Sequence, residues 1–231
     1  MGKLTTVLAG FGLASAASAA VPAANATLRN WGSTPEEQMR SWPGDELVGE
    51  PAASSAKAVD VEAPVEEVWR WLVQIGQDRG GWYSYEWLEN LVGLRIRNAE
   101  EIREEWQHLA PGDVVRMVPR GYLHLLREGF GLPVAIVEPP RLLVLREDPA
   151  DMPWDAVWTF AVEERGPDRC RLVSHSREHR EPSGSPVGRF AATAAGAPFE
   201  LLTHVMTRKM LLTLRDRAER SRSVRRMTTD R

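Results

Sequence analysis

Residues 59–93 read VDVEAPVEEVWRWLVQIGQDRGGWYSYEWLENLVG, and this stretch decides the fold. A strand is expected over residues 56–61, where apolar and polar residues alternate. Pro64 suits the first turn of a helix, and the apolar residues then recur at three and four until Gly76. A second helical segment is expected over residues 86–92. The stretch therefore predicts one strand followed by two short helices.

Downstream of this stretch the pattern changes from helical to extended. A polar helix is expected first, over residues 98–109. Pro- and Gly-containing turns then separate expected strands at 113–119, 132–138, 141–147, 155–165 and 169–180. After a linker at 182–188, apolar residues recur at three and four over a long helix at 190–220, which Pro198 is expected to kink or restart.

This order of elements predicts an α+β domain in which a curved antiparallel sheet wraps around a long C-terminal helix. A strongly curved sheet cannot pack flat on a straight helix, so we expect a cavity between the two. The expected organisation is a hydrophobic segment at 1–27, a connector at 28–55, the domain itself at 56–216 and a basic tail at 217–231. Within the connector, STPEEQ at 33–38 predicts a short helix capped by Ser33 or Thr34.

The N-terminal segment has no charged residue between positions 4 and 28. Its length is close to the roughly 20 residues that cross a bilayer, which predicts membrane association through an uncleaved anchor. Small residues at 17–19 and 24–26 also resemble signal-peptidase sites, so export after cleavage is the alternative.

Composition excludes several classes of function. The chain has 231 residues, 43% of them hydrophobic, and a net charge of −3, so it is globular and has no overall basic field for nucleic acid. Cys170 is the single cysteine, and His175 and His179 lie about 13 Å apart along one expected strand. We therefore predict no disulfide, no metal site and no cofactor.

Several segments resemble one superfamily. They are WGSTPEEQMRSWPGDELV (31–48), the 59–93 stretch, PGDVV (111–115), VAIVEPPRLLVL (134–145), WTFAVEE (158–164) and RLVSHSR (171–177). The chain is similar to START/Bet v 1-like (SRPBCC, polyketide cyclase/dehydrase and lipid transport) proteins, and within them to a bacterial subgroup of unassigned function. The resemblance implies the helix-grip fold. Because the superfamily contains cyclases, hydrolases and lipid or hormone binders, it does not decide the function.

The segment GGWYSYEWLEN at 80–90 concentrates aromatic residues in a chain that is 7% aromatic. These side chains are either core residues or the wall of a cavity that binds a hydrophobic small molecule, such as a lipid or a polyketide. Alternation places Tyr83 and Tyr85 on one face and Trp82 on the other. The side chains expected to line such a cavity are Trp82, Tyr83, Tyr85, Met117, Trp158, Phe160 and Met206.

Two alternatives to simple binding remain. The cavity could belong to a cyclase or dehydratase, in which Tyr85, Arg116 or His204 would serve as acid or base. The domain could also be an envelope-associated interaction module without a ligand. No spacing in the sequence demands catalysis, so binding is the first hypothesis.

Overall fold

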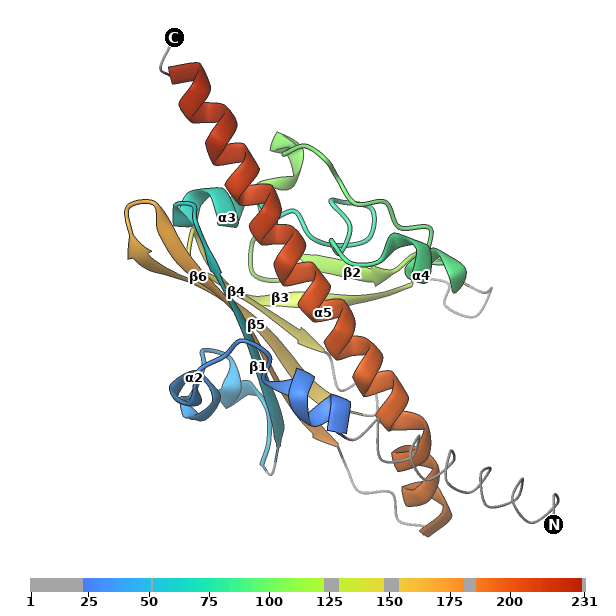
Figure 1. The fold of residues 1–231 in the computed structure, drawn as a ribbon. Coiled ribbons are helices and arrows are strands. Elements are labelled where there is room, and N and C mark those ends of the chain that lie inside the picture. The colour runs from blue at the N-terminus through green and yellow to red at the C-terminus, as the bar shows by residue number, and fades with distance from the viewer. Residues whose placement is uncertain (1–22, 51, 123–128, 148–153, 181–185, 230–231) are drawn as a thin grey trace, which may run out of the picture.

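The computed structural model describes residues 23–50, 52–122, 129–147, 154–180 and 186–229, and its centre is a six-stranded antiparallel sheet (Figure 1). The strand order is β1-β6-β5-β4-β3-β2, so the first strand pairs with the last and every other pairing joins neighbours in the chain. The strands are β1 (Ala53–Val61), β2 (Val114–Val118), β3 (Phe130–Glu138), β4 (Leu142–Glu147), β5 (Trp154–Gly166) and β6 (Arg169–Arg180). All six strands expected from the sequence are confirmed.

The helices occupy the ends and the long connections of the sheet. The short helices are α2 (Pro35–Met39), α3 (Val65–Leu72) and α4 (Glu86–Leu91), with 3-10 turns η1 (Asp45–Leu47) and η2 (Glu104–Trp106). Residues 23–29 are also helical, and α5 (Pro186–Thr229) ends the described chain. The fold is thus a helix-grip-like α+β arrangement, as expected. Among the described residues no helix is long and apolar enough to cross a membrane, and residues 1–22, which hold most of the expected anchor or signal, lie outside them.

The polar helix expected over residues 98–109 is wrong, because only Glu104–Trp106 forms a single 3-10 turn. The apolar residues of this segment, Ile102 and Leu109, pack against the main core without a continuous helix between them. Side chains satisfy the backbone of the segment instead: Gln74 Oε1 accepts from the N–H of Arg103, and Glu86 Oε1 accepts from the N–H of Asn98. Such bonds replace the helical ladder in an irregular loop.

The two faces of the sheet pack against different layers. The face toward α5, which we call the helix-side face, carries the main core: Val59 and Val61 of β1, Leu172 of β6, Phe160 of β5 and Leu143 of β4 are buried there. The opposite face carries a smaller cluster around Trp42 of the connector, formed with Ala58, Val144, Val157 and Val173. Alternate residues of the strands therefore contribute to two hydrophobic cores, one on each face of the sheet.

The connector is held on the outer side by a buried ion pair. Arg171 of β6 donates from Nη2 to Glu37 Oε2 at 2.9 Å and to the carbonyl of Gly32 at 2.7 Å. Both charged residues are buried, Glu37 at 4% and Arg171 at 8% exposure. Thr34 caps α2 in a capping box with Glu37, so one carboxylate serves both the helix start and the ion pair. This contact fixes the 28–55 segment to the sheet.

The long helix α5 has 44 residues, which makes it about 66 Å long. It crosses the sheet diagonally and extends beyond it at both ends (Figure 1). Its contacts fall mainly on α3 and on the β1–β6 side of the sheet. Near its C-terminal end, Ser221 Oγ accepts from Trp71 Nε1 of α3 at 3.1 Å. The helix continues through Pro198, so the expected restart at that residue is wrong.

Candidate functional site

A row of aromatic rings lies on the helix-side face. Trp82, from the loop after α3, stacks on Trp158 of β5 with centroids 5.6 Å apart and planes 15° from parallel. Trp158 in turn lies 4.7 Å from Phe160, centroid to centroid. Three of the side chains expected to line a cavity are therefore brought together. The Nε1 atom of Trp82 is buried and has no hydrogen-bond partner among the described residues.

Glycines allow this loop to approach so closely. A Cβ on Gly80 would lie 2.6 Å from both the Gln74 carbonyl oxygen and the Tyr83 hydroxyl. Gly81 has φ +78, and a Cβ there would lie 2.6 Å from Asn98 Oδ1. A side chain at either position would push the loop outward. The glycine pair thus sets where Trp82 enters the core.

Some apolar side chains on this side of the sheet remain partly exposed. Phe160 and the neighbouring Leu145 are fully buried. By contrast, four apolar side chains from β2, β3, β5 and α5 are only half-buried: Met117, Phe130, Trp158 and Met206. Met117, Phe130 and Trp158 pack against the main core, and the helix-side cluster draws its α5 members from Met210 onward. The described part of α5 before Met210, residues 198–209, thus leaves apolar surface incompletely covered.

A polar corner adjoins the aromatic row at the β1–β6 edge. Lys57 of β1 lies directly opposite Ser174 of β6, and Ser174 Oγ accepts from Trp158 Nε1 at 2.8 Å. Lys57 is 3% exposed, and Ser55 Oγ lies 3.4 Å from its Nζ. Burial, and secondarily the charge of Arg29, lower the pKa of Lys57 to about 8. A buried amine therefore stands one strand away from the aromatic rings.

His204 of α5 belongs to the same corner. It is 6% exposed, its Nε2 lies 3.4 Å from Glu200 Oε1, and its Nδ1 has no hydrogen-bond partner within the described part of the chain. Burial and the nearby charge of Lys57 lower its pKa, so the ring is neutral at pH 7. Glu200 is itself bonded to Arg29 at 2.5 Å.

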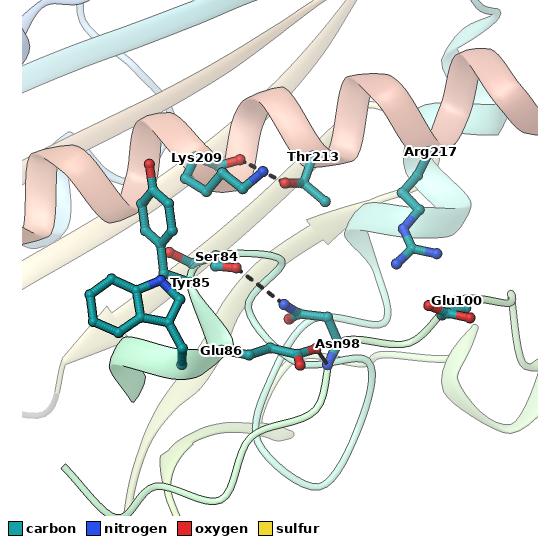
Figure 2. Close-up of a pocket in the computed structure, with 9 residues that line it drawn as sticks. Ser84, Tyr85, Glu86, Asn98, Glu100, Lys209, Thr213 and Arg217 are labelled. Atoms are coloured by element: carbon teal, nitrogen blue, oxygen red, sulfur yellow. Dashed lines mark hydrogen bonds between the residues drawn. The ribbon is translucent and has the colours of Figure 1, made fainter. Parts of the chain in front are cut away.

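A separate surface groove of about 450 Å³ lies between α5 and the 84–100 segment (Figure 2). Tyr85 reaches this groove, where Lys209 Nζ lies 5.9 Å from the centre of its ring. Ser84 Oγ donates to the Met206 carbonyl at 3.2 Å, which ties the loop to the helix. The groove is lined by Ser84, Tyr85, Glu86, Trp87, Asn98, Glu100, Lys209, Thr213 and Arg217.

Tyr83 does not line the surface groove. It is fully buried beside Trp71, with ring centroids 6.0 Å apart, and its hydroxyl accepts from Gln74 Nε2 at 2.6 Å. Burial raises its pKa to about 12. Its φ of +54 breaks the extended alternation that would have placed Tyr83 and Tyr85 on one face. Tyr83 is a core residue, whereas Tyr85 faces the groove.

The three acid–base candidates occupy three environments. Tyr85 lines the groove, His204 belongs to the polar corner, and Arg116 of β2 has its Nε 3.8 Å from Asp78 Oδ2. His175 lies on the outer face, 2.8 Å from Asp45. No cluster of three or more His, Cys, Asp or Glu side chains able to hold a metal occurs within the described ranges.

Sequence reasoning missed Lys57. It shares strand parity with Val59 and Val61, which are core residues, so its side chain had to enter the same layer. A lysine two residues before two buried valines on one strand is the signal that could have identified it.

No family model and no curated protein matches the chain. Among solved structures, similar ones include the ZhuI aromatase/cyclase from Streptomyces sp. R1128 (15% identity, 73% of this chain and 94% of that chain, TM-score 0.39). Norcoclaurine synthase from Thalictrum flavum is 14% identical over 67% of this chain and 91% of that one, with TM-score 0.36. A protein of unknown function from Enterococcus faecalis is 14% identical over 77% and 89%, with TM-score 0.35. These structural neighbours are Bet v 1-like, and the similarity concerns the fold alone.

Proposed function

We propose that this domain binds a hydrophobic small molecule between the helix-side face of the sheet and the N-terminal half of α5. The observation that carries the proposal is the incomplete burial of Trp158, Met117, Phe130 and Met206 on one side of the sheet. Apolar surface of this kind is stabilised when a ligand removes it from water, by about 25 cal/mol per Å² before ordering costs.

Two further features support binding. The Trp82 indole N–H is a buried donor without a partner among the described residues, so a ligand acceptor would satisfy it. Few polar contacts join this loop to α5: Ser84 donates to the Met206 carbonyl at 3.2 Å, and Lys209 lies over the ring of Tyr85. A modest movement there would widen the space beside Trp82 without disrupting the core around Met210 and Leu214.

Titration with Nile red, a neutral apolar dye, tests the proposal. The wild-type protein should give saturable fluorescence enhancement, and Met206→Trp, which fills the space, should weaken binding at least tenfold. Phe199→Trp is the matched control, because Phe199 lies on the same helix but is 66% exposed, and it should bind as the wild type does. Absence of saturable binding by the wild type, or unchanged affinity of Met206→Trp with equal thermal stability, would contradict the proposal.

A second test needs no added probe. Organic extraction and native mass spectrometry of the purified protein should reveal a co-purifying apolar compound that the Met206→Trp variant retains less well.

A further inference from the structure

The polar corner beside the aromatic row, formed by Lys57, Ser174 and His204, contains a buried cation without a paired carboxylate among the described residues. Lys57 is almost completely buried on the helix-side face, and Ser55 is its only hydrogen-bond partner among the described residues. No described carboxylate lies within ion-pair distance of its Nζ. An isolated buried ammonium is strongly unfavourable unless an opposite charge or several acceptors approach it.

The surrounding groups do not neutralise this amine. The charges that act on Lys57 are those of Arg29 and Glu200, and these two are already paired at 2.5 Å. His204 is neutral, and its Nδ1 lacks a partner in the described part of the chain. The corner therefore holds two cations against one carboxylate and has unfilled hydrogen-bonding capacity on both Lys57 and His204.

Apolar side chains begin directly next to this corner, because the partly buried Trp158 donates from Nε1 to Ser174 Oγ. Lys57 and Ser174 are opposite each other in the β1–β6 ladder, and Ser174 pairs across β5 with Phe160. Four residues paired across neighbouring strands thus form one row on this face. They are a cation, a hydroxyl, an aromatic ring and an aliphatic side chain, in the order Lys57, Ser174, Phe160 and Leu143. Opposite residues in such ladders have Cβ atoms about 5 Å apart, so the polar and apolar portions are contiguous.

The geometry points to an amphipathic organic acid as the ligand: its carboxylate is held by Lys57, and its apolar body lies over Trp158 toward Met206. This inference rests on the proposed function and names the class of molecule bound. A carboxylate supplies the charge that Lys57 lacks and accepts the hydrogen bonds that the corner can donate. A neutral analogue supplies the same apolar area but leaves the amine uncompensated.

Competition with Nile red distinguishes the binding of any apolar molecule from a preference for an organic acid. Myristic acid and myristyl alcohol have the same chain, so we expect the acid to displace the dye at least tenfold more effectively from the wild type at pH 7. In Lys57→Met the acid should lose this advantage, while the alcohol binds within about twofold of its wild-type affinity. A buried methionine fills similar volume without the charge, so thermal unfolding should show a folded variant.

Lys209→Met is the matched control. Lys209 also projects from the protein as a cation near this region, but it lines the surface groove beside Tyr85. Its substitution should leave the preference for the acid intact. Equal displacement by acid and alcohol in the wild type, or a preference that depends on Lys209 instead of Lys57, would overturn the inference while leaving apolar binding in place. Failure of both compounds to bind would overturn the proposed function as well.

Discussion

Trp82 and Trp158 lie face to face, 5.6 Å apart between ring centroids, although 76 positions separate them in the chain. One ring comes from the loop between α3 and α4, and the other comes from β5. The stack therefore fastens the loop that borders the proposed site to the middle of the sheet.

Replacing Trp82 should lower stability. Trp82→Ala removes a buried indole and one partner of the stack, so we expect a loss of about 3 kcal/mol in the free energy of unfolding. Urea denaturation measures this loss. Trp87→Ala is the control, since that side chain is 68% exposed, and its effect should stay within about 0.5 kcal/mol. Equal effects of the two substitutions would show that the stack does not hold the loop.

The connector should depend on its buried ion pair. Glu37→Gln removes the buried carboxylate that pairs with Arg171 and leaves the exposed carboxylate of Asp60, 3.1 Å from Nη1, as its anionic partner. Breaking the buried pair should cost about 3 kcal/mol. Glu104→Gln, at an exposed pair with His108, should change stability by less than about 1 kcal/mol. Guanidinium unfolding curves of the two variants give the comparison, and a Glu37→Gln protein as stable as the wild type would refute this role.

Mild acid should destabilise the domain through its buried histidines. Burial lowers the pKa of His175 despite the opposing effect of Asp45, and burial together with Lys57 lowers that of His204. An unfolded histidine titrates near about 6.5. The unfolded state therefore binds more protons below that pH, and stability, complete above it, should decline as the pH falls, by at most about 1.4 kcal/mol per pH unit for each histidine.

Urea midpoints at several pH values between 7.5 and 5.5 measure the decline. His175→Gln should reduce the slope, whereas His108→Gln, at an exposed position, should leave it unchanged. A slope that is the same in all three proteins would show that His175 is not a titrating group in this range.

Asn98 should prove important for the loop geometry. Its Oδ1 accepts from the N–H of Tyr83 at 2.6 Å, and its Nδ2 donates to the Ser84 carbonyl at 3.2 Å. Asn98→Ala leaves a buried N–H unsatisfied beside a residue with positive φ, so we expect a loss of about 2 kcal/mol. Asn98→Asp retains the acceptor for Tyr83 and should lose less in thermal or urea unfolding. An aspartate variant that is no better than the alanine variant would argue against this assignment.

The elements with a strong period could be predicted from the sequence. Alternation identified β1, and apolar runs between Pro- and Gly-containing turns identified the other five strands. The apolar spacing of α5 identified the helix that crosses the sheet. The 98–109 segment failed because charged and polar residues with good helix propensity also suit an irregular loop, and only tertiary hydrogen bonds to Gln74 and from Tyr83 decide between them. Local propensity contains no information about those partners.

The site was less accessible to sequence reasoning. Trp82, Trp158 and Phe160 do come together, but Tyr83 turns into the core because its φ is positive, which alternation cannot reveal. Lys57 was overlooked because strand lysines are mostly exposed. Its burial depends on the pairing of the first strand with the last, a contact between residues more than a hundred positions apart.

The helix α5 connects the proposed site to a distant part of the protein. His204 stands beside Lys57, and Ser221 receives its hydrogen bond from Trp71, about 26 Å farther along the same rod. No proline interrupts the helix between these two residues, so this part of α5 moves as a rigid body. A bound ligand that tilts α5 at His204 would strain the hydrogen bond between Trp71 and Ser221. Ligand binding would then be detectable at Trp71, far from the ligand itself.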